Sequence, residues 1–249
     1  MVQYSVAWED KSANKQKISG LLSRQVLSTD ILIFPEMTLT GYSLKAENLA
    51  EEIHGDTFEY FAKLSQQYKT DVVYGLVLRE GNKYFNALVY LSSTGECLAL
   101  YKKIHPFSYA KENKVYTGGE QPVAIERDGV KIGLSICYDI RFPELFRYYA
   151  KGRADIIINI ANWPVERINH WNILTQSRAI ENQAFVVAVN RCGSDPKVSY
   201  GGASRIIDPM GNVLCDGGDG EKVICAAIDV QELYDTRSRY PFLDDMKLM

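Results

Sequence analysis

KIGLSICYDIRFPELFRYYAKG, residues 131–152, joins an apolar run to an amphipathic run through a short polar turn. The run 131–137 is short and apolar, as buried strands are. The run 143–152 is predicted to be a helix, because a proline stands at its first position and a glycine near its end. A strand that passes into a helix through such a turn places Cys137 at the mouth of a sheet, as nucleophile elbows do for serine.

Similar units lie on both sides of this segment. Apolar strands are predicted at residues 2–8, 31–34, 71–78, 84–91, 97–103, 155–162, 184–191, 204–208, 212–215 and 223–230. Helices are predicted at 12–27, 57–68 and 170–183. So many strands with interspersed helices indicate an α/β fold, a four-layer α-β-β-α sandwich of two mixed sheets packed face to face with helices outside. No linker or repeat divides the chain, so residues 1–249 are expected to form a single domain.

Composition limits the classes of function. The 249 residues carry a net charge of −3 with no block of one sign, which argues against nucleic acid or a membrane surface as the main partner. The start of the chain lacks a basic segment followed by an apolar run, so no signal peptide is expected. The five cysteines are scattered and odd in number, which favours free thiols in a reducing cytoplasm over a disulfide framework or a metal site.

Three reactive side chains stand at the ends of predicted strands. Glu36 follows 31–34, Lys103 ends 97–103 and Cys137 ends 131–137. Active sites of α/β proteins gather beyond the carboxyl ends of strands, so these residues are candidates for one site. A thiol needs a neighbouring cation or base to become a thiolate. His105 is a possible base, so a Cys–His pair remains open beside a Cys–Lys–Glu arrangement.

Three blocks carry a family resemblance: PEMTLTGY (35–42), YKKIHPF (101–107) and SICYDIRFPELFR (135–147). In this order they resemble the motifs of the nitrilase superfamily of carbon–nitrogen hydrolases. Later segments are similar to the ω-amidase branch: ANWP (161–164), RAIENQAFV (178–186), NRCGSD (190–195) and SRIIDPMGN (204–212). The resemblance implies hydrolysis of the side-chain amide of 2-oxoglutaramate or 2-oxosuccinamate to the oxo-dicarboxylate and ammonia, with no cofactor or metal. It also implies the α-β-β-α sandwich and a homodimer.

Carried over residue by residue, the resemblance makes Glu36 the general base, Lys103 a catalytic lysine and Cys137 the nucleophile. A second glutamate usually follows the lysine, and Glu112 is chosen for it ahead of Glu120. Glu36 would take the thiol proton, the thiolate would attack the amide carbonyl, and water would release the acid from a thioester.

Other residues are expected to surround the substrate. Lys103 and the backbone N–H of Tyr138 would stabilise the oxyanion. The expected substrate-binding residues are Tyr138, Trp163, Tyr42 and Arg141. A free carboxylate on the substrate needs a cation, and the sequence does not choose among Arg141, Arg167 and Arg191. Asp139 and Glu144 are expected to make structural ion pairs and helix-start contacts.

Alternative functions remain open at this point. The same chemistry at Cys137 would serve an enzyme that cleaves N-carbamoyl groups, aliphatic amides or a deamidated peptide-like amide. A protein of another class would use the sandwich as a non-catalytic binding scaffold, or Cys137 as a redox-sensing thiol. In every enzymatic reading the partner is a small-molecule amide.

Overall fold

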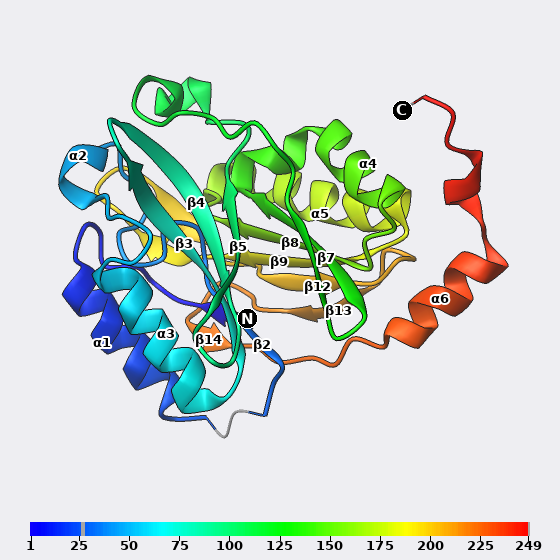
Figure 1. Cartoon of the computed structure of the whole chain (residues 1–249), viewed down its shortest axis with the longest axis horizontal. Coiled ribbons are helices and arrows are strands. Elements are labelled where there is room, and N and C mark those ends of the chain that lie inside the picture. The colour runs from blue at the N-terminus through cyan, green and yellow to red at the C-terminus, as the bar shows by residue number, and fades with distance from the viewer. Residues whose placement is uncertain (26–27, 249) are drawn as a thin grey trace.

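The computed structural model describes residues 1–25 and 28–248 and contains two mixed β-sheets (Figure 1). The larger sheet has the order β13-β12-β9-β8-β7-β6. Its strands are β6 (Ala124–Arg127), β7 (Val130–Ile136), β8 (Ile156–Ala161), β9 (Phe185–Asn190), β12 (Arg205–Ile207) and β13 (Val213–Asp216). The smaller sheet has the order β2-β3-β4-β5, and its strands are β2 (Ile31–Ile33), β3 (Asp71–Glu80), β4 (Lys83–Leu91) and β5 (Cys97–Lys102).

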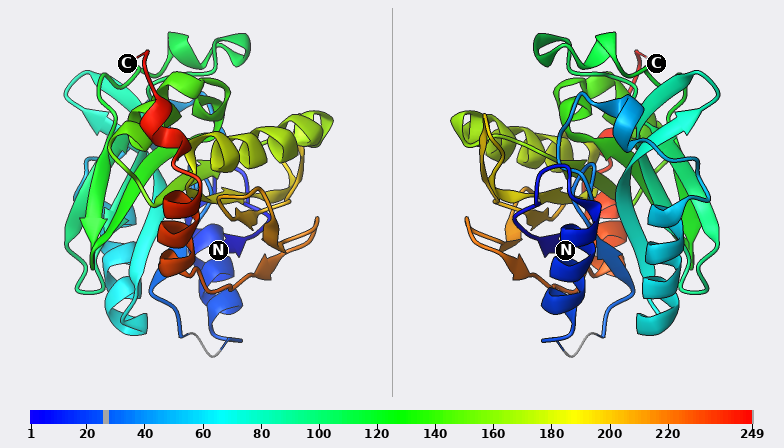
Figure 2. Two further views of the ribbon diagram at one scale, coloured as in Figure 1. Left: turned by 90° about the vertical axis from the view of Figure 1, so that its right-hand side faces the viewer. Right: turned by 90° about the vertical axis from the view of Figure 1, so that its left-hand side faces the viewer.

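Helices cover the outer face of each sheet. The main helices are α1 (Lys11–Leu22), α3 (Asp56–Tyr68), α4 (Pro143–Lys151), α5 (Ile168–Asn182) and α6 (Val230–Arg239), with a short α2 (Ala46–Leu49). α1 and α3 lie beside the smaller sheet, and α4 and α5 lie on the larger one (Figures 1 and 2). The predicted α-β-β-α sandwich of two mixed sheets is therefore confirmed.

Alternating side chains at residues 32–34, in β2 and directly after it, show that both faces of the smaller sheet are buried. Leu32 and Phe34 pack in one apolar cluster with Ile18 of α1 and Phe61 of α3. Ile33, which lies between them in the sequence, packs in the other cluster against residues of the larger sheet. Successive side chains of a strand point to opposite faces, so a strand buried on both faces reads as a continuous apolar run.

Strand direction brings the reactive segments to one edge. β2 pairs in parallel with β3, whereas β4 runs antiparallel to both β3 and β5, so β2 and β5 point the same way. In the larger sheet β7, β8 and β9 are parallel neighbours. The segments that follow β2 and β5 therefore leave the smaller sheet at the same edge. The segments that follow β7 and β8 likewise leave the larger sheet at one edge.

The predicted boundaries were wrong in several places. The predicted strand 2–8 is only the two-residue β1 (Val2–Gln3), which pairs with β14 (Lys222–Val223). Of the expected strand 223–230, only Val223 lies in a strand, and its last residue, Val230, begins α6, which Asp229 caps by accepting hydrogen bonds from two backbone amides of the first turn. The predicted helix 12–27 ends at Leu22, and its last two positions, including Val26, lie outside the described residues.

A small hairpin, β10 (Cys192–Ser194) with β11 (Ser199–Gly201), completes the fold and was not predicted. Each helix in the described part of the chain is too short or too polar to cross a bilayer.

Gly75 allows β3 to approach the turn that follows β2. A Cβ atom at Gly75 would lie 2.2 Å from the backbone nitrogen of Met37 and 2.8 Å from the Cα of Glu36. The Gly75 amide also donates to Thr38 Oγ1 at 2.9 Å, and its carbonyl accepts from the Thr38 amide at 3.0 Å. The turn that carries Glu36 thus packs directly against the backbone of Gly75.

We therefore expect Gly75→Ala to lower the free energy of unfolding by about 1–3 kcal/mol, because the added methyl group overpacks this contact. Urea unfolding followed by circular dichroism measures the change. Gly20→Ala is the matched control, because a Cβ at Gly20 meets open space within α1 and should leave stability equal or slightly raised. Equal stabilities of the Gly75→Ala and wild-type proteins would contradict this account of the turn.

Candidate active site

Four segments that follow strands contribute polar side chains to one site. Glu36 lies in the turn after β2, Lys103 directly after β5, Cys137 directly after β7 and Asn162 directly after β8. Glu112 joins them from a short 3-10 helix, Glu112–Lys114, on the loop that follows Lys103. Polar side chains from both sheets thus come together at this edge.

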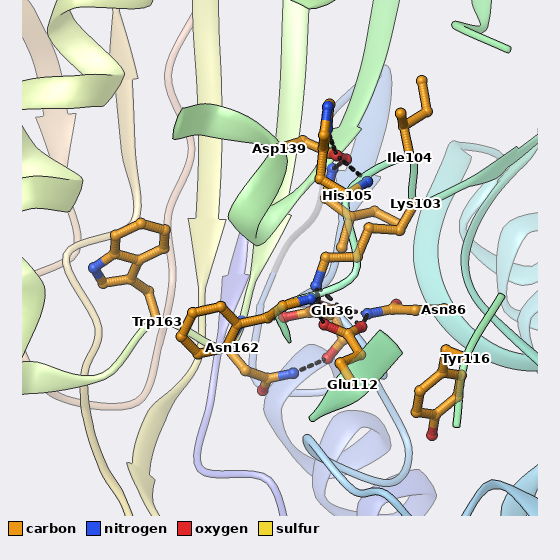
Figure 3. Close-up of polar contacts among 12 residues, drawn as sticks. Glu36, Asn86, Lys103, Ile104, His105, Glu112, Tyr116, Asp139, Asn162 and Trp163 are labelled. Carbon is orange, nitrogen blue, oxygen red and sulfur yellow. Dashed lines mark hydrogen bonds and ion pairs between the residues drawn. The ribbon is translucent and has the colours of Figure 1, made fainter. Parts of the chain in front are cut away.

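Lys103 lies in a buried ion network with two glutamates (Figure 3). Its Nζ is 2.9 Å from Glu36 Oε1 and 2.9 Å from Glu112 Oε2. The side chains of all three residues are at most 1% exposed. Burial alone would lower the pKa of Lys103, but the carboxylates of Glu112 and Glu36 outweigh it and raise the pKa well above its usual value. The lysine is therefore a fixed ammonium.

Two asparagines hold the carboxylates in place. Asn86 of β4 donates its amide nitrogen to Glu36 Oε1 at 2.6 Å and to Glu112 Oε1 at 2.9 Å. The backbone amide of Asn162 donates to Glu36 Oε2 at 2.8 Å, and its side chain donates to the Glu36 carbonyl. Neither asparagine is among the site residues predicted from the sequence. A buried asparagine inside the apolar strand 84–91 was the available signal, because buried polar groups need partners.

Cys137 occupies a strained turn. It is the first residue of the 3-10 helix Cys137–Arg141 and has a φ of +47°, a left-handed conformation that costs energy for a residue with a Cβ. The residue is partly exposed and lines a pocket together with Lys103 and Asn162. This geometry is the elbow that the segment 131–152 predicts, except that β7 ends one residue before the cysteine.

The electrostatic surroundings keep the resting thiol protonated. Burial of the sulfur, and then the negative charge of Glu36, raise the pKa of the Cys137 thiol well above its usual value. Lys103 acts in the opposite direction, as does a backbone hydrogen bond from Asn162. Thiolate formation therefore needs a group that removes the proton, and Glu36 is the carboxylate with the largest effect on the thiol.

His105 is held by another residue. Its Nδ1 is 2.8 Å from Asp139 Oδ1, and its ring stacks on Phe142 with centroids 3.8 Å apart. His105 does not line the pocket that contains Cys137. The geometry thus favours the Cys–Lys–Glu arrangement over the Cys–His pair. Asp139 makes contacts at the start of its 3-10 helix, as expected, and the ring partner of its carboxylate is His105.

The pocket above Cys137 has a volume of about 210 Å³. Its lining includes all four expected substrate-binding residues: Tyr42, Tyr138, Arg141 and Trp163. The Tyr42 hydroxyl is buried and has no hydrogen-bond partner within the part of the chain that the structure describes. A buried hydroxyl without a partner is costly, so this group is available to a bound molecule.

Two arginines lie at this pocket. The Arg141 guanidinium stacks over Trp163 at 4.8 Å, and that of Arg167 lies 5.7 Å from the Phe107 ring. Neither forms an ion pair with a carboxylate of the described residues, although Glu166 also lines the pocket. Partial burial lowers the pKa of Arg141, and the charge of Arg167 adds to this effect. The pocket therefore holds two guanidinium groups that are not paired with a carboxylate of the described residues, and the hydrogen-bond partner of Arg141 is the ring of His170.

Two candidates from the sequence lie elsewhere. Arg191 is fully buried, donates to the carbonyls of Cys192 and Val6, and stacks on Tyr200 at 4.2 Å. It does not line the pocket, so it is excluded as the group that meets a substrate carboxylate. Glu120 lines a separate surface depression, whereas Glu112 is bonded to Lys103. Glu112 is therefore the glutamate that the structure brings to the lysine.

Comparison with known proteins gives a consistent picture. The family model described as carbon-nitrogen hydrolase matches residues 1–238. The chain is 34% identical to a 2-oxoglutaramate amidase of Bacillus subtilis (strain 168), over 99% of this chain and 96% of that protein. It is 30% identical to the omega-amidase YafV of Escherichia coli (strain K12), over 98% of this chain and 94% of that one.

A solved structure shows the same fold. The CN-hydrolase superfamily protein XC1258 from Xanthomonas campestris, which has an arsenic adduct in its active site, superposes with a TM-score of 0.95 at 30% identity. The alignment covers 100% of this chain and 96% of that one. The resemblance predicted from the three sequence blocks is thus confirmed. The chain belongs to the carbon–nitrogen hydrolase family of the nitrilase superfamily and is an enzyme that hydrolyses carbon–nitrogen bonds of amides other than peptides.

Proposed function

We propose that this enzyme is an ω-amidase that hydrolyses the terminal amide of a short oxo-dicarboxylate monoamide, with 2-oxoglutaramate as the best candidate. The observation that carries the proposal is one small pocket with the Cys137–Lys103–Glu36 group beside two arginines that form no ion pair with a carboxylate in the described part of the chain. Two relatives, each covered almost end to end, support the proposal: one is named a 2-oxoglutaramate amidase and the other an omega-amidase.

The first half of the proposed reaction forms a thioester. Glu36 takes the proton of the Cys137 thiol as the sulfur attacks the amide carbonyl. The cluster of Lys103, Glu36 and Glu112 carries one positive charge against two carboxylates, so a resting thiolate would add a further negative charge. Proton transfer to Glu36 during the attack avoids that cost. Glu36 then gives the proton to the leaving nitrogen, and ammonia departs.

The oxyanion of the tetrahedral intermediate needs donors that are already in place. Lys103 supplies an ammonium that Glu36 and Glu112 fix in position. The backbone N–H of Tyr138 is in the first turn of the 3-10 helix Cys137–Arg141, where amides have no acceptor within the helix. We assign both groups to the oxyanion. The buried Tyr42 hydroxyl is a further donor on the same pocket wall.

The second half of the reaction releases the acid. Glu36 removes a proton from water, the oxygen attacks the thioester carbonyl, and the proton returns to the Cys137 sulfur as the bond to carbon breaks. The products are the dicarboxylate and the free enzyme. Glu112 keeps contact with Lys103 through both oxygens, so it holds the ammonium while Glu36 changes its protonation state.

Arg141 and Arg167 are proposed to bind the free carboxylate of the substrate. A carboxylate and a guanidinium make charge-assisted hydrogen bonds, and a partly enclosed site strengthens them. The ring of Trp163 supports Arg141 from below, which limits its rotamers. With a cavity of about 210 Å³, the site suits a substrate of a few carbon atoms.

We also propose that the enzyme works as a homodimer in the cytoplasm. The five cysteines of the chain are free thiols, in keeping with a reducing compartment. Ile173 and Ile180, seven residues apart on α5, are 54% and 52% exposed, which gives an apolar stripe that a second copy can cover. Sedimentation velocity of the purified protein tests the dimer.

Cys137→Ala should abolish ammonia release from 2-oxoglutaramate, because the variant cannot form the thioester. A coupled glutamate dehydrogenase assay measures the ammonia. Cys97→Ala is the matched control, because Cys97 is exposed on β5 and does not line the pocket. Wild-type turnover that persists in Cys137→Ala would exclude cysteine chemistry. A wild type that releases no ammonia would exclude this substrate, and N-carbamoyl and aliphatic amides would be tried next.

Lys103→Ala should reduce kcat by roughly two to three orders of magnitude, because an oxyanion donor is lost in a buried site. The lysine also lowers the pKa of the Cys137 thiol, so its loss should move the alkaline rise of alkylation by iodoacetamide to higher pH. Lys102→Ala is the control, because the neighbouring Lys102 pairs with Glu80 on the surface. Near-normal turnover by folded Lys103→Ala protein would rule out the assigned role.

Arg141→Gln and Arg167→Gln should each raise KM for 2-oxoglutaramate by roughly ten- to a hundredfold, the effect of losing one hydrogen bond to a charged group. Their turnover of butyramide, which has no carboxylate, should change little. Arg79→Gln is the control, since Arg79 lies on β3 and pairs with Glu52. Equal losses on both substrates would contradict recognition of the carboxylate by these arginines.

A further inference from the structure

Asp139 is a buried carboxylate that the proposed reaction does not use. Its side chain is fully buried and accepts four hydrogen bonds. Oδ2 accepts from the Tyr101 hydroxyl at 2.7 Å and from the Ile136 amide at 2.9 Å. Oδ1 accepts from the backbone amide of His105 at 3.0 Å and from its ring Nδ1 at 2.8 Å. A carboxylate with four hydrogen bonds links the segments that supply its donors.

The four donors come from the two segments that carry the reactive residues. Tyr101 and His105 stand two positions before and two positions after Lys103. Ile136 directly precedes Cys137, and Asp139 stands two positions after it. Figure 3 shows the His105–Asp139 contact directly beyond the Lys103 side chain. A single carboxylate therefore joins the segment of the lysine, from the smaller sheet, to the elbow of the cysteine, from the larger sheet.

We propose that the Asp139–His105 pair is a positioning device that fixes Lys103 relative to the Cys137 elbow. This inference rests on the proposed roles of Cys137 and Lys103. Asp139 and His105 touch no reacting atom in it and act only through these two residues.

The strained backbone of Cys137 needs support, and the link through Asp139 provides it. Cys137 has a φ of +47°, and such a conformation persists only where the surroundings over-determine it. Asp139 closes the turn around Cys137 by accepting from the Ile136 amide, and it anchors the same turn to the other sheet through His105. Phe142 stacks on the His105 ring and holds it in the plane in which Nδ1 meets Asp139.

The Tyr101 hydroxyl remains a donor across the working range of pH. Burial, and then the charge of Asp139, raise the pKa of Tyr101 well above its usual value, so its hydroxyl keeps its proton. Tyr149, a further titratable group near Asp139, also has its pKa raised by burial and by that carboxylate. Among the four bonds, only the one from the His105 ring can be removed without a change in the backbone or in the buried core.

Two substitutions of His105 separate its donor from its ring. His105→Phe keeps the stacking on Phe142 and removes the donor to Asp139. His105→Asn loses the stacking and keeps a nitrogen donor at the same number of bonds from the backbone as Nδ1. His54→Phe is the matched control, because the exposed His54 also packs on a phenylalanine, Phe58, and makes no ion pair with a described carboxylate.

Two readouts are measured for each variant: steady-state ammonia release from 2-oxoglutaramate, and the pH profile of Cys137 alkylation by iodoacetamide, followed by peptide mapping. His105→Phe should lower kcat by roughly ten- to a hundredfold with little change in KM. Its alkylation profile should move to higher pH, because Lys103 lies less favourably for the sulfur. His105→Asn should restore most of the kcat and most of the wild-type alkylation profile. His54→Phe should match the wild type in both.

A purely structural role gives a different result. If His105→Phe lowers the melting temperature but keeps the wild-type kcat and alkylation profile in the folded protein, the positioning role is wrong. Equal losses in His105→Phe and His105→Asn would also overturn it, because the donor would then not matter. A wild type that releases no ammonia would count against the proposed function instead, and the alkylation profiles would still test the link.

Discussion

The ammonium of Lys103, enclosed by the carboxylates of Glu36 and Glu112, is the interaction on which the site depends. A buried ammonium without partners would be strongly unfavourable, and so would two buried carboxylates without a cation. The three groups are therefore stable only together, and Asn86 and Asn162 supply the remaining hydrogen bonds. Because Asn162 comes from the larger sheet and the other four residues from the smaller sheet and its loops, the network completes only when the sheets have packed.

The packing of the two sheets also positions the reactive side chains. Strands buried on both faces are rigid, so the turns that follow them hold their side chains with little freedom. The same turns leave the apolar core and open into a pocket, where Cys137 is partly exposed while its pKa is raised. In the proposed reaction the Cys137 thiol is therefore protonated at rest, and Glu36 is the carboxylate that removes its proton. A substrate carbonyl, which accepts the negative charge, makes the transfer favourable.

Local sequence patterns predicted most of the fold. Continuous apolar runs defined the central strands, and a proline and a glycine marked the bounds of α4. The patterns failed where tertiary contacts decide the outcome: residues 225–228 are as apolar as a strand but belong to no strand of the described residues, and Asp229 then caps α6. The positions of Glu36, Lys103 and Cys137 at strand ends predicted that they would meet. Glu112 was preferred to Glu120 from the family resemblance. The partners of Asn86 and the exclusion of Arg191 needed the three-dimensional arrangement, because the sequence does not show which distant segments come into contact.

The central claim is that Cys137 becomes acylated during turnover. Intact-protein and peptide mass spectrometry after rapid acid quenching of the enzyme with 2-oxoglutaramate tests it most directly. The account predicts an acyl adduct, formed with loss of ammonia, on the peptide that contains Cys137, and its disappearance once the substrate is consumed. Ammonia release without any adduct on this peptide, or an adduct on another cysteine, would contradict the account.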